Sequence, residues 1–157
     1  MEMENSIIKK LQDLLGEKII EVKIQRERRI FVKVIREAFK EAVKNLVNEL
    51  GFKHLSTITG VDLGENLEII YHLSNGSIEL SLKVNLPKKE AKLPTVTDFI
   101  PGALLYEREV HDLLGVVFEG HPDLSPLLLP EKWPLGVYPL RKEETLESLR
   151  KAIAENS

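Results

Sequence analysis

The chain has 157 residues, of which 43% are hydrophobic and 30% are charged, enough apolar material for one globular core. Its formal net charge of -3 leaves no basic excess to neutralise phosphates, which argues against a nucleic-acid-binding protein. Because the chain has no cysteine, it cannot hold an iron-sulfur or nickel-iron centre through thiolates of its own. No apolar run is long enough to cross a membrane and the N-terminus is acidic, so we expect neither membrane insertion nor secretion.

The first fifty residues carry the periodicity of two helices and a hairpin. A short amphipathic helix is predicted to begin at a Ser6 cap and to end at Gly16. Two strands with alternating charged and apolar residues then flank a turn at 26–28. The inner face of this hairpin is predicted to carry Ile20, Val22, Ile24, Ile30, Val32 and Val34. Apolar residues at helical spacing predict a second helix over 37–50, which Gly51 ends.

Three further strand patterns and a third helix follow. The strands are predicted over 55–61, 67–73 and 78–84, and the Ser74-Asn75-Gly76 turn joins the last two. The alternating positions of the first of these strands are Leu55, Thr57, Thr59 and Val61. The third helix is predicted over 102–114. This order predicts an α+β fold, with an antiparallel or mixed sheet of about five strands and helices on one face.

The C-terminal quarter of the chain combines prolines with apolar residues. Five of the eight prolines fall between Pro122 and Pro139, so the segment is predicted to be extended. We therefore divide the chain into an α+β domain, 1–118, and an extended C-terminal arm, 119–157, with a possible short terminal helix. An apolar segment of this kind either wraps its own domain or docks onto another subunit.

One run of residues resembles a known family. Residues 105–124, which read LYEREVHDLLGVVFEGHPDL, contain every fixed position of the pattern E-R-E-x-x-D-[LM]-x-G-[IV]-x-F-x-G-H-P. Residues 128–133 and 138–142 continue the match with LLPEKW and YPLRK. The run resembles the signature of the 30 kDa subunit of respiratory complex I. Upstream of residue 105 only the order of the predicted elements agrees.

Two departures from the complex I form indicate a branch of this family. Ser125-Pro126 stand where complex I members commonly carry an arginine, and Pro134-Leu135-Gly136-Val137 lengthens the spacing between Trp133 and Tyr138. This longer form is similar to the corresponding subunit of group 4 membrane-bound nickel-iron hydrogenases. Lys142-Glu143 also replaces the usual Lys-Asp pair. The resemblance therefore favours a hydrogenase-type or related ferredoxin-linked complex over quinone-linked NADH oxidation.

The resemblance implies a structural subunit on the cytoplasmic side of a membrane-bound complex. The implied partners are the large hydrogenase-like subunit, of the complex I 49 kDa type, and the small iron-sulfur subunit. They would carry the iron-sulfur clusters and any nickel-iron site, and this chain would carry no cofactor and no catalytic residue. The residues implied to bind the partner are Glu107, Arg108, Glu109, Asp112, Gly115, Phe118, Gly120, His121, Pro122, Leu128, Trp133, Tyr138, Pro139, Leu140, Arg141 and Lys142.

Spacing alone supports more modest roles for several of these residues. On a helix, Arg108 and Asp112 lie four residues apart and can form an ion pair, as can Glu107 and His111, each contributing a few tenths of a kcal/mol. His111 and His121 do not have the spacing of a usual metal site. Trp133 is expected to anchor the arm.

Three alternatives to the hydrogenase-type subunit follow from the same residues. The first is the 30 kDa-type subunit of NADH:quinone oxidoreductase itself. The second is a free-standing interaction module that binds peptides or small ligands through the arm and is a stable monomer. The third, an independent hydrolase or transferase, is the least favoured because no spacing singles out a catalytic set of residues.

Overall fold

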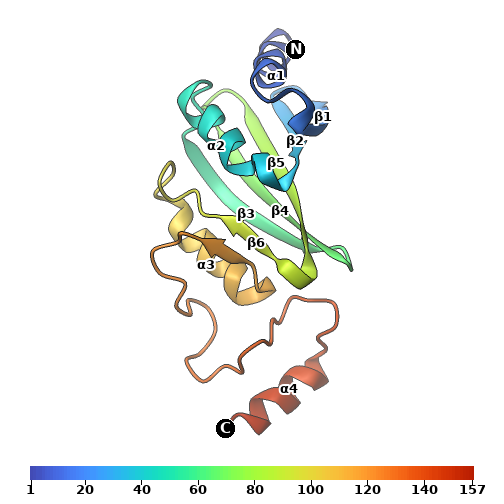
Figure 1. Cartoon of the computed structure of the whole chain (residues 1–157), viewed down its shortest axis with the longest axis vertical. Coiled ribbons are helices and arrows are strands. Elements are labelled where there is room, and N and C mark those ends of the chain that lie inside the picture. The colour runs from blue at the N-terminus through green and yellow to red at the C-terminus, as the bar shows by residue number, and fades with distance from the viewer.

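The computed structural model describes residues 1–157 as an α+β domain followed by a C-terminal segment with little regular structure (Figure 1). Its longer helices are α1 (Glu2–Leu15), α2 (Phe39–Asn48), α3 (Ala103–Leu114) and α4 (Leu146–Glu155). The strands are β1 (Ile19–Arg26), β2 (Arg29–Val34), β3 (His54–Asp62), β4 (Asn66–Ser74), β5 (Glu79–Pro87), β6 (Lys92–Pro94) and β7 (Val117–Glu119). None of the helices is long and apolar enough to cross a membrane.

The main sheet has five strands in the order β1-β2-β5-β4-β3. Its neighbouring strands are antiparallel except for β2 and β5, which run parallel at the centre. The parallel pair arises because α2 carries the chain from β2 to the far edge, and the β3-β4-β5 meander then returns to the middle. The predicted mixed sheet of about five strands is confirmed.

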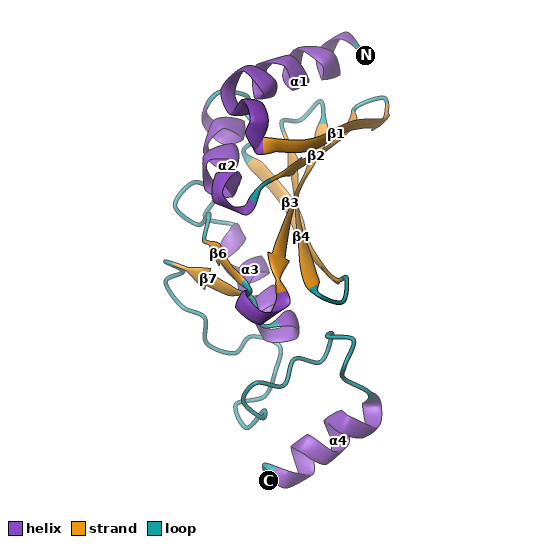
Figure 2. Cartoon of the chain, turned by 45° about the vertical axis from the view of Figure 1, so that its right-hand side comes forward, coloured by secondary structure: helices purple, strands orange, loops and turns teal.

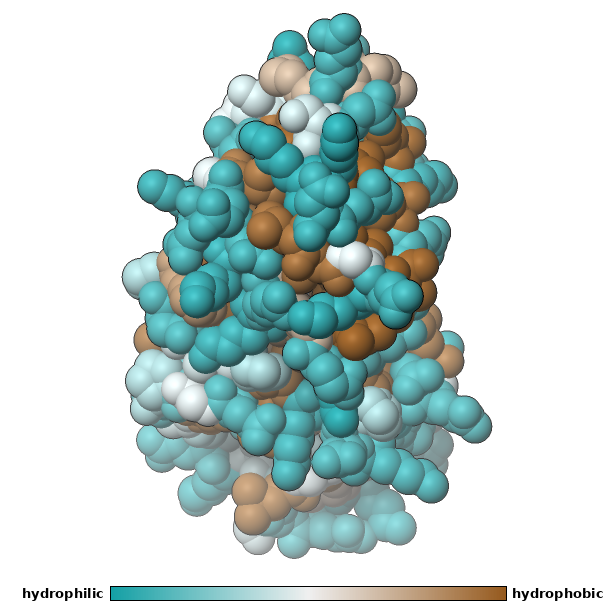
Figure 3. Space-filling view, turned by 45° about the horizontal axis from the view of Figure 1, so that its top comes forward, coloured by the Kyte–Doolittle hydropathy of each residue, from teal (hydrophilic) through white to brown (hydrophobic).

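Helices α1, α2 and α3 cover one face of this sheet, as predicted (Figure 2). One continuous core, extending from Leu11 to Phe118, fills the space between the helices and the sheet. Within it, the rings of Phe39 on α2 and Tyr71 on β4 pack with their centroids 4.9 Å apart. Hydrophilic side chains cover most of the surface seen from the α1 end, with hydrophobic ones visible between them (Figure 3).

Helix α1 begins earlier than predicted, at Glu2, and Ser6 lies inside it rather than at its cap. The reason is Glu4, which is 1% exposed. Its carboxylate lies 3.0 Å from the Met1 ammonium and accepts a hydrogen bond of 2.6 Å from the N–H of Arg28. These contacts join the first turn of the helix to the β1–β2 hairpin. The sequence has no capping residue before Glu2 that would have indicated this earlier start.

Two predicted strand faces were wrong because β-bulges shift the alternation. In β1 the register shifts between Ile19 and Glu21, so Ile20 is 58% exposed although it was predicted to face the core. In β3 the register shifts between Leu55 and Thr57. Beyond that bulge Ile58 is buried, and Thr57, Thr59 and Val61, which were predicted to alternate with Leu55 on one face, are exposed.

A small second sheet, which was not predicted, positions the start of the arm. Strands β6 and β7 pair in parallel, with Leu93 opposite Phe118. The N–H of Val117 donates to the carbonyl of Ala91 and the N–H of Thr95 donates to the carbonyl of Glu119. Because each strand has only three residues, neither shows a recognisable alternation.

Candidate functional site

Helix α3 carries the first part of the motif, and two glycines determine how it packs. It ends as predicted at Gly115, which adopts a left-handed φ of 79° and donates its N–H to the carbonyl of His111. On the sheet side, the Leu114 side chain lies so close to Gly60 of β3 that a Cβ atom on Gly60 would overlap it. Glycine at position 60 therefore lets α3 pack directly on the sheet.

Glu107 is completely buried and joins α3 to the core instead of pairing with His111. Its carboxylate accepts hydrogen bonds from the Tyr71 hydroxyl at 2.9 Å, the Thr95 hydroxyl at 2.6 Å and the Val96 N–H at 3.0 Å. Burial raises the pKa of Glu107, and these three donors oppose that shift. The result is a satisfied polar network that holds α3 against β4 and the 95–96 segment.

Arg108 and Asp112 were predicted as a possible ion pair, but each binds the arm. The Arg108 guanidinium donates to the carbonyls of Ser125 at 3.1 Å and Pro126 at 3.0 Å, and to the Ser125 hydroxyl at 3.2 Å. One Asp112 oxygen accepts the N–H groups of residues 127, 128 and 129 at 2.9, 2.8 and 3.2 Å. Together the two side chains hold the backbone of residues 125–129 in one conformation.

A second attachment lies at the C-terminal end of α3. The Arg141 guanidinium donates to the Leu114 carbonyl at 2.7 Å, and the N–H of Leu140 donates to the Leu113 carbonyl at 3.0 Å. The Tyr138 ring lies against Gly115, where an added Cβ would approach ring carbons to 2.5 Å. The arm thus satisfies carbonyls that the helix end leaves without intrahelical partners.

A third attachment joins the arm to the end of β3. Asp62 accepts the N–H of Lys142 at 2.8 Å and lies 2.6 Å from the Lys88 ammonium, which also contacts Glu143 at 3.0 Å. Burial by itself raises the pKa of Asp62, but the N–H of Lys142, the Lys88 ammonium and the N–H of Gly64 outweigh it and lower the pKa to about 2. We call these three attachments, made by Arg108 and Asp112, by the end of α3, and by Asp62, the clamp.

The two motif histidines make local hydrogen bonds. The Nδ1 of His111 is 2.8 Å from the Val116 carbonyl. The Nε2 of His121 lies 3.0 Å from the Leu104 carbonyl, and its Nδ1 accepts the N–H of Asp123 at 3.0 Å. No group of three or more His, Cys, Asp or Glu side chains is placed to hold a metal ion.

While the clamp holds the backbone of the arm, many of its apolar side chains face outward. Trp133 is half-buried and donates its indole N–H to the Val137 carbonyl at 2.8 Å. Helix α4, predicted as a short terminal helix, has no buried residue. The exposed large apolar residues of the arm are Leu127 at 38%, Leu128 at 55%, Leu135 at 99%, Leu140 at 57%, Leu146 at 66% and Ile153 at 43%.

The structure separates the predicted partner-binding residues into two groups. Those buried within the chain are Glu107, Asp112, Gly115 and Phe118. Those exposed or half-exposed are Arg108, Glu109, Gly120, Pro122, Leu128, Trp133, Tyr138, Pro139, Leu140, Arg141 and Lys142. The side chain of His121 is buried, with its Nε2 3.9 Å from the Glu107 carboxylate. Among the buried residues, Asp112 binds the arm's backbone directly and Glu107 holds α3 against the core. Any effect of these two residues on a partner is therefore indirect, through the position of α3 and the arm.

Sequence reasoning missed four residues of this site. Tyr71 and Thr95 bind Glu107. Asp62 binds the N–H of Lys142, and Lys88 pairs with Asp62. Asp62 lies at the end of a predicted strand and Lys88 follows another, and neither belongs to a motif. Their role depends on the fold, since Asp62 and Lys142 are 80 residues apart in the chain.

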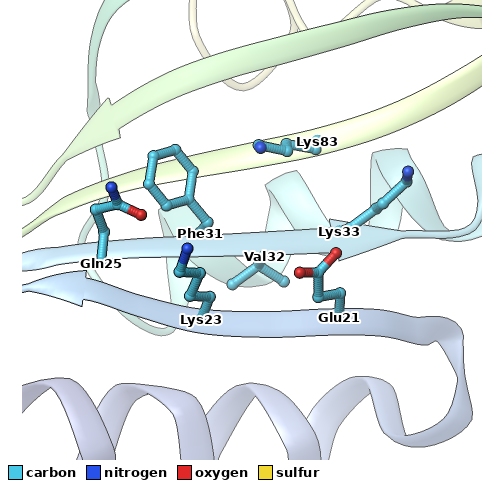
Figure 4. Close-up of a pocket in the computed structure, with 7 residues that line it drawn as sticks. All are labelled: Glu21, Lys23, Gln25, Phe31, Val32, Lys33 and Lys83. Carbon is cyan, nitrogen blue, oxygen red and sulfur yellow. The ribbon is translucent and has the colours of Figure 1, made fainter.

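The sheet face opposite the helices offers a separate, shallow cleft of about 180 Å³ (Figure 4). Its side chains come from β1, β2 and β5 and include Lys23, Phe31 and Lys83. The Lys83 ammonium lies 4.6 Å from the centre of the Phe31 ring. None of the motif residues reaches this cleft, so we place the candidate site at α3 and the arm.

The fold and the clamp together define a class of protein, an α+β domain whose central motif holds an extended C-terminal arm. Residues 32–149 match the family described as the respiratory-chain NADH dehydrogenase 30 Kd subunit. The chain belongs to this family, as the motif over 105–124 indicated.

Relatives in this family are subunits of different oxidoreductases. The chain is 36% identical over 142 residues to one of the subunits of the F(420)H(2) dehydrogenase of Methanosarcina mazei, and the match covers 88% of this chain and 89% of the relative. It is 35% identical over 122 residues to the beta subunit of the membrane-bound hydrogenase of Pyrococcus furiosus, with 74% of this chain and 70% of the relative covered.

Two solved structures share the fold. A chain of the membrane-bound sulfane sulfur reductase, an archaeal respiratory membrane complex, superposes with a TM-score of 0.82 at 29% identity, covering 95% of this chain and 90% of that one. A trypsin-resistant fragment of Nqo5 superposes with a TM-score of 0.67 at 30% identity, covering 79% of this chain and 100% of the fragment.

Proposed function

We propose that this chain is a cofactor-free structural subunit of a membrane-bound oxidoreductase complex, of the group 4 nickel-iron hydrogenase type or a related ferredoxin-linked type. It docks through the C-terminal arm onto the large catalytic subunit. The proposal rests on one observation: the arm's backbone is bound to the domain while its apolar side chains face solvent. Arg108 and Asp112 of α3 bind the arm's backbone, and Arg141 of the arm binds the Leu114 carbonyl. Leucines at 128, 135 and 140 instead project outward with more than half of their surface exposed.

The comparisons support the role of a subunit in an assembly. The relatives are named as subunits of oxidoreductases, one of them a membrane-bound hydrogenase, and the structure with the greater coverage belongs to an archaeal respiratory membrane complex.

The proposed partners and location follow from the family. The large hydrogenase-like subunit and the small iron-sulfur subunit would carry the iron-sulfur clusters and any nickel-iron site. This chain would lie peripherally on the cytoplasmic side of the cell membrane and join the membrane only through the complex. Its own role would be to position the large subunit, with no catalytic residue of its own.

The second candidate is a subunit of NADH:quinone oxidoreductase, which the description of the family favours. The feature that favours the hydrogenase type is the longer Trp133–Tyr138 connection, which forms a turn closed by the Trp133 indole and the Val137 carbonyl. Metal content separates the two: nickel in proportion to the large subunit supports the hydrogenase type, and iron-rich partners without nickel support the other.

The proposal is tested by affinity purification of the tagged full-length chain from its native host in mild detergent, with mass spectrometry of its partners. We expect large and small oxidoreductase subunits to co-purify. Leu128→Asp combined with Leu140→Asp should abolish their recovery, because charged groups would enter the interface. Ile20→Asp, on the exposed bulge of β1, is the matched control. A metal-free monomer would instead support a free-standing interaction module.

Truncation before His121 tests the arm as a whole. We expect the sheet domain to keep its far-ultraviolet circular dichroism while the truncated chain fails to join the complex. Truncation before Leu146 removes only α4 and keeps the clamp, so the two truncations separate the contributions of the arm and the terminal helix. Normal assembly of the chain without the arm would refute the docking role.

A further inference from the structure

Leu135 is the most exposed large apolar side chain of the molecule. Its exposed fraction is 99%, whereas no other large hydrophobic residue exceeds 66%. Burying a leucine side chain typically contributes about 1.5–3 kcal/mol, and Leu135 realises none of it in the isolated chain. It lies in the segment by which this chain departs from the complex I form of the motif.

The backbone around Leu135 is held in a defined turn. The Trp133 N–H donates to the Pro130 carbonyl at 2.9 Å, and the Trp133 indole closes the turn on the Val137 carbonyl at 2.8 Å. Pro134 restricts the position before Leu135, and Gly136 after it adopts a left-handed φ of 75°. The side chain therefore projects from a preorganised tip.

Both sides of this turn are attached to the domain by the clamp. Asp112 holds the backbone before it and the Tyr138 ring rests on Gly115 after it. Preorganisation of this kind lowers the entropy lost when the tip is bound. A single large apolar side chain on a rigid convex tip is the form of an interface anchor.

We propose that Leu135 is the anchor residue of the arm and inserts into an apolar, uncharged pocket on a neighbouring protein subunit. This inference rests on the proposed docking function, because it names the contact that the same arm makes. The charges next to the tip, Glu131 and Lys132, balance one another. The tip therefore offers no net positive charge to attract an anionic partner surface. Recognition depends instead on an apolar pocket that fits the leucine side chain.

A protein pocket fits this tip better than a lipid surface or a second copy of the chain. Membrane-surface segments combine several apolar residues with an excess of basic ones, and the tip has one leucine and no net charge. The principal clefts of this chain are lined mainly by polar and charged residues, with at most two apolar side chains each. A second copy thus offers no matching pocket among them.

The test compares Leu135→Asp and Leu135→Ala in the tagged full-length chain, produced in the native host and purified in mild detergent. Partner subunits are quantified by mass spectrometry relative to the chain. We expect recovery to fall about tenfold for alanine and further for aspartate. Ile20→Asp should leave recovery unchanged. The melting temperature of each purified free variant should match the parent, because the Leu135 side chain is in contact with solvent alone.

The outcomes separate this inference from the proposed function. If Leu135→Asp assembles normally while the Leu128→Asp and Leu140→Asp variant does not, the proposal that Leu135 is the anchor is wrong and the proposed docking function of the arm is retained. If the chain truncated before His121 also assembles normally, both proposals are wrong. Leu135-dependent binding of the free chain to phosphatidylglycerol vesicles, or Leu135-dependent dimerisation in gel filtration, would also contradict the proposal that Leu135 inserts into a pocket of a neighbouring subunit.

Discussion

Arg108 and Asp112 lie one helical turn apart, where opposite charges commonly pair on the helix surface. A solvated pair of this kind contributes a few tenths of a kcal/mol. Asp112 is only 5% exposed, and three N–H groups of the arm converge on one of its oxygens. Hydrogen bonds to a charged group typically contribute about 1.5–3 kcal/mol each, so the contact with the arm outweighs the pair along the helix.

Asp112→Asn tests this account. The amide oxygen can still accept hydrogen bonds but lacks the charge, so we expect the 127–129 turn to lose about 1–2 kcal/mol of local stability. Hydrogen exchange of these three amides should accelerate about tenfold, while the sheet amides keep their protection. Glu109→Gln, on the exposed side of α3, serves as the control. Unchanged exchange at 127–129 would show that Asp112 does not hold the turn.

Gly115 is required for two separable reasons, its left-handed φ and the Tyr138 ring against its Cα. Gly16, with a φ of 54° and nothing near its Cα, provides a comparison in which only backbone strain applies. We expect Gly16→Ala to cost about 1 kcal/mol of unfolding free energy and Gly115→Ala to cost more. Urea unfolding measures both.

The excess cost at Gly115 should disappear in a Tyr138→Ala background, because the ring is then absent. Equal costs for the two alanine substitutions in the parent chain would contradict the packing of Tyr138 on Gly115. The comparison also reports whether the second attachment of the clamp forms in the free protein.

At the scale of elements, Asp62 joins the arm, at Lys142, to the end of β3. In the sequence this residue is an ordinary strand end, yet it links β3, the segment after β5 and the arm through Gly64, Lys88 and Lys142. Its contacts favour the ionised carboxylate, which gives the attachment a pH dependence.

The pKa of Asp62 is about 2 in the folded protein, below its ordinary value of 3.8. Its contribution to stability is therefore complete above about pH 4 and is lost as the pH falls through about 2. Trp133, the single tryptophan of the chain, lies in the arm and reports this change by fluorescence anisotropy. We expect anisotropy to fall within that window in the parent chain.

Asp62→Asn should remove this transition and leave the arm looser at neutral pH. Glu4→Gln is the matched control, because hydrogen bonding to the Arg28 N–H also lowers the pKa of Glu4 to about 2, and Glu4 lies on α1 away from the arm (Figure 1). If the Asp62→Asn variant kept the full fall in anisotropy at acid pH, a group other than Asp62 would be responsible for the release of the arm.

At the scale of the whole molecule, the N-terminal helix and the C-terminal helix lie at opposite ends, with the sheet between them (Figure 1). The arm emerges at the α3 end and depends on side-chain contacts rather than on a core of its own. Segments of this kind open locally at lower free energy than the sheet. The free chain should therefore be attacked by proteases in the arm first.

Limited trypsin digestion tests this order. Lys132 is exposed in the arm, and we expect the first cut of the free chain after Lys132 or at Arg141–Lys142, before any cut in the five-stranded sheet. In the purified complex these cuts should slow about tenfold or more, and in free Asp112→Asn they should become faster. Equal rates in the free chain and the complex would count against the docking arm.

Several features of this protein were predictable because they depend on residues close together in the chain. The helix ending at Gly115 and the Ser74-Asn75-Gly76 turn are local in this sense, and so is the motif over 105–124 that identifies the family. The α+β class also followed from the order of such elements. Periodicity failed where a bulge interrupted it, at Ile20 and Thr57.

The sequence alone thus determined the family and the class of fold. Only the tertiary structure decided that β5 lies parallel to β2, that Glu107 is buried against Tyr71, and that Asp62 binds the backbone of Lys142. The physical reason is distance along the chain. A charged side chain takes the partners that give it the most hydrogen bonds at the least cost in desolvation, and for these residues the folded chain brings those partners from far away in the sequence.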